Sequence, residues 1–173
     1  MSAEASLPAS CVCGHVTLQA IGTPILSLVC YCESCRSAAR QFEQAPGAPS
    51  VLNGYGGVDY CLYRKDRVRI VGGAEHLRDH RLTEASPTRR VIAACCNTPM
   101  FLEFTKGHWL SLYRDRFPQG APPLEMGVMA KELPPGSTPA ENLPTYRTRP
   151  PRFMIKLLTS WAAMGFRKSK MNR

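Results

Sequence analysis

Seven of the eight cysteines in this sequence of 173 residues fall into three short motifs. The motifs are CVCG at residues 11–14, CYCESC at residues 30–35 and CCN at residues 95–97. Thiols spaced this closely can bind a soft metal ion such as zinc, form disulfides or act as a redox pair. The chemistry open to the chain therefore depends on which of these states its cysteines adopt.

The middle motif brings Cys30, Cys32 and Cys35 into one short segment. The Cys-x-x-Cys spacing of its last two thiols is common in zinc sites, but thioredoxin-like redox pairs share it, usually at a helix start in a βαβ unit. The flanking sequence predicts antiparallel strands, so we favour three thiolates on one metal and keep a redox couple of Cys32 and Cys35 as the alternative. A fourth position would be filled from elsewhere or left open, and an open position is typical of catalytic zinc.

The first and third motifs offer two thiols each. Cys11 and Cys13 would project from one face of an extended strand and could share an ion, although two partly buried structural cysteines fit the same pattern. Cys95 and Cys96 are adjacent, so in a strand they would point to opposite faces and only one would join a given site. Asn97 tolerates the left-handed conformation and precedes Thr-Pro, which favours a turn that would bring both thiols together.

Two further residues bear on these motifs. Cys61 stands alone in DYCLY and is predicted to be a small buried residue of a strand. His15 directly follows Gly14, and we expect it to support a metal site from outside the set of ligands.

The elements that would position the motifs are mostly short strands. Runs rich in β-branched and aromatic residues alternate with Gly, Pro and Asn-Gly turn signals, which predicts antiparallel strands rather than βαβ units. A short helix is predicted to begin within residues 36–42, after the middle motif. The predicted fold class is therefore mainly β. The predicted strands cover residues 16–22, 25–31, 58–64, 66–73, 89–96, 99–105 and 108–114.

Composition divides the chain into three parts. Residues 1–117 form the predicted β domain, which contains all the cysteines. Residues 118–151 hold nine of the 15 prolines, which excludes a central strand or a long helix and predicts an arm that wraps the domain or a stiff linker. Residues 152–173 are predicted to form a basic amphipathic helix and tail. Residues 147–173 carry eight of the 22 basic residues and no acidic residue, so the net charge of +9 belongs mainly to this end.

In order and spacing, the three cysteine motifs resemble those of the glutathione-dependent formaldehyde-activating enzymes, a family that includes centromere protein V. The resemblance covers roughly residues 10–117. It implies twisted antiparallel β-sheets with few short helices, to which this chain adds a C-terminal extension. The implied activity is that of a zinc-dependent carbon–sulfur lyase, which forms or cleaves a carbon–sulfur bond in a thiol adduct such as S-hydroxymethylglutathione.

The resemblance also implies roles for individual cysteines. In the family, the first and third motifs hold a structural zinc, and the middle motif holds a second zinc that faces the substrate. Transferred to this chain, the structural ligands would be Cys11, Cys13 and Cys96. The ligands of the open site, and hence the implied catalytic residues, would be Cys30, Cys32 and Cys35.

Three positions depart from the family pattern. Ala93 stands where a cysteine is expected. Cys95 replaces that ligand if the chain bends; otherwise the structural site holds three thiolates or no metal. Tyr31 replaces a histidine in the middle motif, and Asn97 replaces a glycine, which is a mild change because Asn also adopts positive φ. With Cys95 included, the predicted metal ligands are Cys11, Cys13, Cys30, Cys32, Cys35, Cys95 and Cys96.

The sequence therefore predicts a cytoplasmic zinc enzyme that acts on a glutathione conjugate or another small thiol adduct. The first ten residues lack the basic and apolar regions of a secretory signal, and no apolar run reaches the roughly 20 residues that span a bilayer. Four arginines next to the cysteine motifs could bind a glutathione carboxylate, although solvated surface charge would explain each of them as well. They are Arg36, Arg40, Arg89 and Arg90.

The alternative function is a non-catalytic zinc-stabilised module whose basic tail binds an anionic partner. Apolar side chains flanked by cations in residues 147–173 are typical of a helix on acidic lipid, so contact with a membrane surface is one expectation. Nucleic acid is not an expected partner, because the stretch shows no known DNA- or RNA-binding motif. The competing expectation is that the apolar side chains pack on the domain, or on a second subunit in a homodimer, and that residues 167–173 are frayed. These side chains are Phe153, Ile155, Leu157, Leu158 and Trp161.

Overall fold

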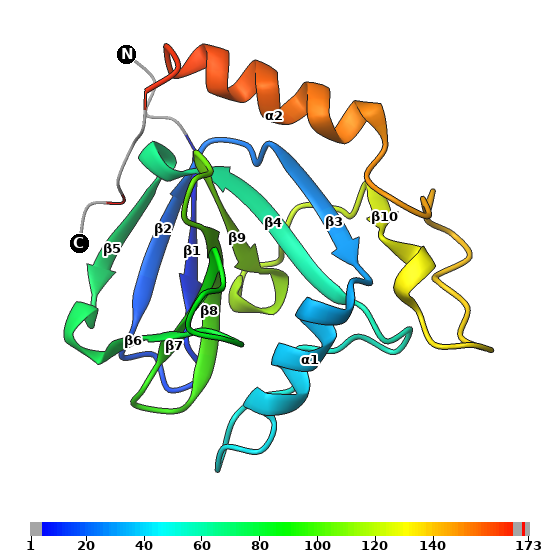
Figure 1. Cartoon of the computed structure of the whole chain (residues 1–173). Coiled ribbons are helices and arrows are strands. Elements are labelled where there is room, and N and C mark those ends of the chain that lie inside the picture. The colour runs from blue at the N-terminus through cyan, green and yellow to red at the C-terminus, as the bar shows by residue number, and fades with distance from the viewer. Residues whose placement is uncertain (1–4, 168–170, 172–173) are drawn as a thin grey trace.

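Antiparallel pairing of short strands builds most of the molecule, which confirms the predicted mainly β fold (Figure 1). The computed structural model describes residues 5–167 and residue 171. A three-stranded sheet has the order β1-β2-β5, and a seven-stranded sheet has the order β10-β3-β4-β9-β8-β7-β6. Neither α-helix in the described part of the chain has the length and apolar content needed to span a bilayer.

The small sheet consists of β1 (Ser6–Ser10), β2 (Thr17–Ile21) and β5 (Val68–Gly72). The large sheet consists of β3 (Leu26–Cys30), β4 (Val58–Arg64), β6 (Leu77–His80), β7 (Thr88–Ala93), β8 (Thr98–Phe104), β9 (Trp109–Tyr113) and β10 (Met126–Val128). The α-helices are α1 (Glu33–Phe42) and α2 (Pro151–Ala163). Short 3₁₀ helices cover Lys65–Arg67, Ala74–His76, Arg114–Arg116 and Ala130–Glu132.

Both faces of the large sheet are buried. Strand β4 shows this, because successive residues of a strand point to opposite sides of the sheet. On β4, Tyr60 and Leu62 belong to a core that includes residues of α1 and α2. Cys61 and Tyr63, from the same strand, belong to a second core shared with the small sheet. The large sheet therefore separates two cores. The side that carries the helices also contains a cavity.

Three strands that the sequence pattern did not predict, β1, β6 and β10, all lie at sheet edges. An edge strand pairs on one side only, so it tolerates proline and charged residues that a central strand would reject. Strand β1 contains Pro8, β6 contains Arg78 and Asp79, and β10 lies in the proline-rich segment. These strands lack the hydrophobic alternation on which the prediction relied.

Helix α1 begins earlier than predicted, at Glu33 inside the CYCESC motif rather than after Cys35. Cys32 is the N-cap residue with an extended backbone. Its carbonyl oxygen accepts the N–H groups of Cys35 at 3.1 Å and Arg36 at 3.2 Å. The motif is therefore a strand-to-helix junction, and Cys35 lies in the first turn of the helix.

The proline-rich segment lies along the edge of the large sheet, where β10 pairs in parallel with β3. The N–H of Gly127 donates to the carbonyl of Pro144, and the N–H of Tyr146 donates to the carbonyl of Gly127, both at 2.9 Å. A Cβ atom at Gly127 would lie 2.5 Å from Oγ1 of Thr145 and 3.0 Å from the ring of Tyr31. Glycine is therefore required where the segment crosses the CYCESC motif.

Helix α2 packs against the domain through one face (Figure 1). Phe153 and Leu157 are buried, and the ring of Trp161 stacks on the ring of His108 with centroids 5.8 Å apart. Ile155 and Leu158 are 58% and 53% exposed, so only part of the apolar surface of this helix packs on the domain. Residues 168–170 and 172–173 of the predicted tail lie outside the described residues.

A buried network of charges connects the strands of the large sheet. Glu103 on β8 is 8% exposed and forms ion pairs of 2.5 Å with Lys65 and with Arg89, which also pairs with Asp79 at 2.7 Å. Burial alone would raise the pKa of Glu103, but Lys65 and Arg89 lower it below its ordinary value. The network therefore stabilises the fold in the ionised state of Glu103.

We predict that Glu103→Gln lowers the free energy of unfolding at pH 7 by about 1 to 3 kcal/mol, because the buried Lys65 loses its charged partner and the partly buried Arg89 loses one of two. A lowered pKa means that the stabilisation is complete above the unfolded-state value and is lost as the pH falls through the folded-state value. The difference between wild type and variant should therefore shrink below about pH 4.

Urea unfolding at several pH values measures this difference, with the exposed Glu84→Gln as a control that should change little. Equal destabilisation of the Glu103 variant at pH 7 and at low pH would contradict the electrostatic role.

Candidate metal centre

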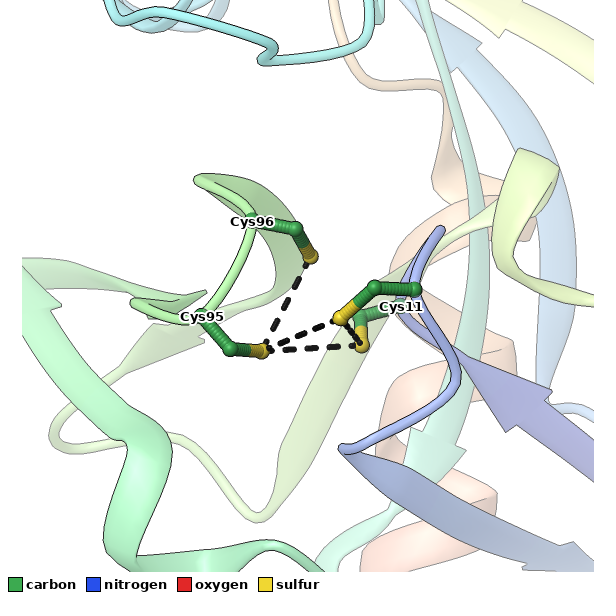
Figure 2. A group of neighbouring side chains, drawn as sticks. Cys11, Cys95 and Cys96 are labelled. Carbon is green, nitrogen blue, oxygen red and sulfur yellow. Dashed lines mark hydrogen bonds between the residues drawn. The ribbon is translucent and has the colours of Figure 1, made fainter.

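Two turns from distant parts of the chain bring Cys11, Cys13, Cys95 and Cys96 together, in what we call the four-cysteine group (Figure 2). The sulfur atoms of Cys13 and Cys95 are 3.4 Å apart, and those of Cys11 and Cys13 are 3.5 Å apart. The Cys11–Cys95 and Cys95–Cys96 sulfur distances are 3.9 and 3.8 Å. All four sulfurs lie within 4.8 Å of one another.

The first pair of thiols lies in a turn, not in the extended strand that the sequence predicted. β1 ends at Ser10, and the N–H of Cys11 then donates to the carbonyl of Val16 at 3.0 Å. The N–H of Gly14 donates back to the carbonyl of Cys11 at 3.0 Å, and Gly14 has a φ of 80°, which favours glycine. The turn, rather than the alternation of a strand, directs both sulfurs to one side.

The second pair converges because the backbone bends after β7, as the sequence of this turn predicted. Asn97 has a φ of 54°, and the N–H of Cys96 donates to the carbonyl of Ala93 at 3.3 Å. Ala93 itself is fully buried in the core between the sheets. Ala93 has no side-chain atom that could bind a metal, and Cys95 lies with the other three cysteines.

These distances fit a tetrahedral metal ion. Zinc–thiolate bonds of about 2.3 Å at tetrahedral angles place sulfur atoms about 3.8 Å apart. Four sulfur–sulfur distances in the four-cysteine group run from 3.4 to 3.9 Å, and all lie within 4.8 Å. Nδ1 of His15 lies 3.2 Å from the sulfur of Cys13, which is the supporting position expected for this histidine.

The thiols of the four-cysteine group differ in acidity. Burial disfavours ionisation of Cys96, but its contacts with Thr98 and Cys13 lower its pKa to about 6. Desolvation and hydrogen bonds to Cys13 and Cys96 raise the pKa of Cys95 to about 12. Without a bound cation, the four-cysteine group therefore keeps thiol protons, such as that of Cys95, which a bound metal would displace.

A buried arginine supplies positive charge next to the four-cysteine group. Arg116 is 4% exposed, and its Nε and Nη1 atoms have no hydrogen-bond partner among the described residues. Burial lowers its pKa, whereas the charges of Asp115, Cys96 and Cys11 act in the opposite direction. Because a guanidinium stays protonated in proteins, Arg116 offsets part of the negative charge of the thiolates.

The strand-to-helix junction brings Cys30, Cys32 and Cys35 together as a three-cysteine group. The sulfurs of Cys30 and Cys32 are 3.4 Å apart, and all three lie within 4.8 Å of one another. Cys30 and Cys35 are buried, and Cys32 is partly buried. This arrangement leaves a fourth tetrahedral position without a cysteine among the described residues.

Electrostatics favour a thiolate at Cys35. Hydrogen bonds from Cys30 and Cys32 hold the pKa of Cys35 well below its ordinary value despite burial, and Tyr60 and Arg90 act in the same direction. The hydroxyl of Tyr60 donates to the sulfur of Cys35 at 3.6 Å. The pKa of Cys30 lies well above its ordinary value because of its contacts with Cys32 and Cys35 and its burial. The N-terminus of α1 adds a further preference for negative charge.

The start of α1 bears on the redox alternative. A helix that begins just after Cys32 is also the placement expected of a thiol–disulfide pair. The third sulfur, from Cys30, lies 3.4 Å from that of Cys32, so the group has three thiols that could hold a metal ion rather than two. Cys61 belongs to neither group and is buried on β4, where it accepts a hydrogen bond from the hydroxyl of Ser27 at 3.4 Å.

A cavity of about 540 Å³ lies between the three-cysteine group and α2. Cys30, Cys32 and Cys35 all line it, and Phe153 and Leu157 line it from α2. No member of the four-cysteine group is among its described lining residues. The two groups therefore differ in their access to a ligand.

Sequence reasoning missed Glu132, which lines this cavity. Its Oε2 atom accepts the N–H of Glu33 at the start of α1 at 2.8 Å, and its carbonyl accepts Nη1 of Arg36 at 2.7 Å. Glu132 comes from the proline-rich segment, more than ninety positions after the cysteines that it approaches. Nothing in the local sequence marks it, since only the parallel pairing of β10 with β3 brings it near.

The four arginines that could bind a glutathione carboxylate or serve as surface charge all have partners within the chain. Arg36 and Arg40 pair with Glu33 at 3.1 and 2.5 Å. Arg89 pairs with Asp79 and Glu103 in the buried network, and Arg90 donates to the carbonyl and hydroxyl of Ser34 at 3.0 and 2.9 Å. None of the four is among the described residues that line the cavity.

Comparison with known proteins supports the resemblance over the first part of the chain. The family model of the glutathione-dependent formaldehyde-activating enzyme matches residues 6–49, which contain the first two cysteine motifs. The predicted resemblance is confirmed for this segment. A crystal structure of a Rhodobacter sphaeroides protein is similar at 13% identity over 81% of this chain and 100% of that chain, with a TM-score of 0.45. A search of curated proteins finds no match.

We predict that Cys95→Ser weakens metal binding at the four-cysteine group by at least about tenfold. Loss of a residue that only hydrogen-bonds to a metal ligand already lowers metal affinity by about that much. Competition of the metal-loaded protein with a chromophoric chelator measures the affinity. Cys61→Ser is the matched control, because it removes a thiol that lies in neither group. Equal metal retention by the two variants would show that Cys95 is not a ligand.

Proposed function

From the family resemblance of residues 6–49 and the geometry of the two cysteine groups, we propose that the chain is a zinc-dependent carbon–sulfur lyase-like enzyme. Its substrate would be a small thiol adduct bound at the three-cysteine group. The four-cysteine group would hold a structural zinc. The observation that carries the proposal is that all three sulfurs of the three-cysteine group line a cavity of about 540 Å³, which is within the usual size range of ligand sites.

Both groups suit zinc by donor type and spacing. Four thiolates close a tetrahedral shell, which is typical of structural zinc, whereas three protein ligands with an open position are typical of catalytic zinc. Zinc held by Cys30, Cys32 and Cys35 would supply a Lewis acid that favours the thiolate form of the substrate sulfur. The sulfur of the substrate would then approach the cavity side of the three-cysteine group.

Cleavage of a hydroxymethyl thioether requires one proton transfer and one bond cleavage. The hydroxyl proton leaves, its oxygen forms a carbonyl with the adjacent carbon, and the electron pair of the carbon–sulfur bond goes to sulfur. Glu132 is the one carboxylate among the described lining residues, so we assign it as the base that accepts the hydroxyl proton. Tyr60 holds the Cys35 thiolate by its hydrogen bond of 3.6 Å.

The second candidate function is a non-catalytic zinc module that contacts an anionic surface. The outward face of α2 favours it, because Ile155 and Leu158 are more than half exposed in a segment that carries no acidic residue. Such a module would bind metal in both groups without turning over a thiol adduct.

We predict that the zinc-loaded protein accelerates exchange of formaldehyde with a thiol, measured by exchange NMR spectroscopy of the hydroxymethyl adduct. Glu132→Gln should lower kcat by about 100-fold or more with little change in KM, because the amide keeps the acceptor oxygen for Glu33 but cannot take a proton. Glu141→Gln, an exposed change in the same segment, is the control and should retain the rate.

Full activity of the Glu132 variant would contradict its assignment as the base. If the wild type does not accelerate the exchange of formaldehyde with any thiol tested, the enzymatic proposal is wrong and the second candidate function remains.

A further inference from the structure

The cavity next to the three-cysteine group has mainly apolar walls. Side chains from the large sheet form one wall, and they include Leu28, Leu62, Leu102 and Trp109. Residues of α2 form the opposite wall, and they are Phe153, Met154 and Leu157. A ligand whose sulfur reached the three cysteines would therefore place the rest of its structure between the sheet and α2.

Charged side chains are scarce in this cavity. Glu132 and Arg149 are the charged residues among those described in its lining, and Arg149 is exposed. Glutathione carries two carboxylates and an ammonium group, and burying these groups requires paired charges. Arg36, Arg40 and Arg89 pair with carboxylates of the chain, and the buried Arg90 is not among the described lining residues, so the cavity offers few partners for a charged tripeptide.

We infer that this site takes thiols with a compact apolar or aromatic substituent in preference to glutathione. The inference rests on the proposed function only for the placement of the substrate sulfur at the three-cysteine group. The apolar substituent would bury surface against Leu102, Trp109 and Phe153, which favours its binding. A hydroxymethyl adduct of such a thiol would then present its oxygen on the side of Glu132.

The C-terminal extension contributes part of this selectivity. Phe153, Met154 and Leu157 lie beyond the cysteine motifs in sequence, and Met129 and Glu132 come from the proline-rich segment. Met154 and Ile155 are neighbours on α2 with exposed fractions of 47% and 58%. Only Met154 of these two is among the described residues that line the cavity, so the pair separates a change in the cavity from a change on the helix surface.

The test is calorimetric titration of the full-length, zinc-loaded protein with phenylmethanethiol and with glutathione under anaerobic conditions. We expect phenylmethanethiol to bind at least about tenfold more tightly than glutathione. Met154→Glu should weaken phenylmethanethiol binding by about tenfold, because it places a charge in the apolar wall. Ile155→Glu should leave the affinity unchanged, and phenylmethanol, which lacks sulfur, should bind more weakly than the thiol.

Equal or tighter binding of glutathione, or equal effects of the two α2 variants, would overturn the inference. Turnover assays with both hydroxymethyl adducts separate it from the proposed function. Turnover of the glutathione adduct alone would overturn the inference and support the proposed function. Preferential binding of phenylmethanethiol without turnover of either adduct would support the inferred ligand class and contradict the enzymatic proposal.

Discussion

The convergence of thiol sulfurs is the constraint on which the rest of the structure depends. Seven of the eight cysteines form two groups, and within each group all sulfurs lie within 4.8 Å of one another. Thiolates this close repel one another, and a bound metal ion removes that repulsion as it displaces their protons. The turns at residues 11–15 and 94–97 and the early start of α1 all have the conformations that this convergence requires. Arg116 and Arg90 place buried positive charge next to the two groups.

The C-terminal extension and the CYCESC motif form one structural unit. Tyr31 stands where the family has a histidine, and its hydroxyl oxygen accepts the N–H of Ala140 from the extension at 3.3 Å. A histidine ring has no phenol oxygen for this contact. The tyrosine ring also lies against Gly127, where β10 pairs with β3. Tyr31 therefore holds the added segment next to the CYCESC motif, and the same segment supplies Met129 and Glu132 to the lining of the cavity.

The sequence predicted the central strands and the two sets of cysteines, because both leave local signals. Strand β4 was predicted with its observed bounds, and Asn97 indicated the turn that brings Cys95 to its partners. The edge strands were missed because charge and proline hide their pattern. The geometry at Cys11 was predicted wrongly, because a Cys-x-Cys spacing fits a turn as well as a strand. Glu132 and the cavity depend on contacts between residues far apart in sequence, which no local pattern encodes.

The most direct test of the central claim is the metal content per chain of protein purified without added metal, measured by elemental analysis. We expect two equivalents of zinc, one in each cysteine group. One equivalent would contradict the assignment of a metal to both groups. Absence of metal together with reversible oxidation of Cys32 and Cys35 would contradict a metal site in either group and favour a thiol redox protein.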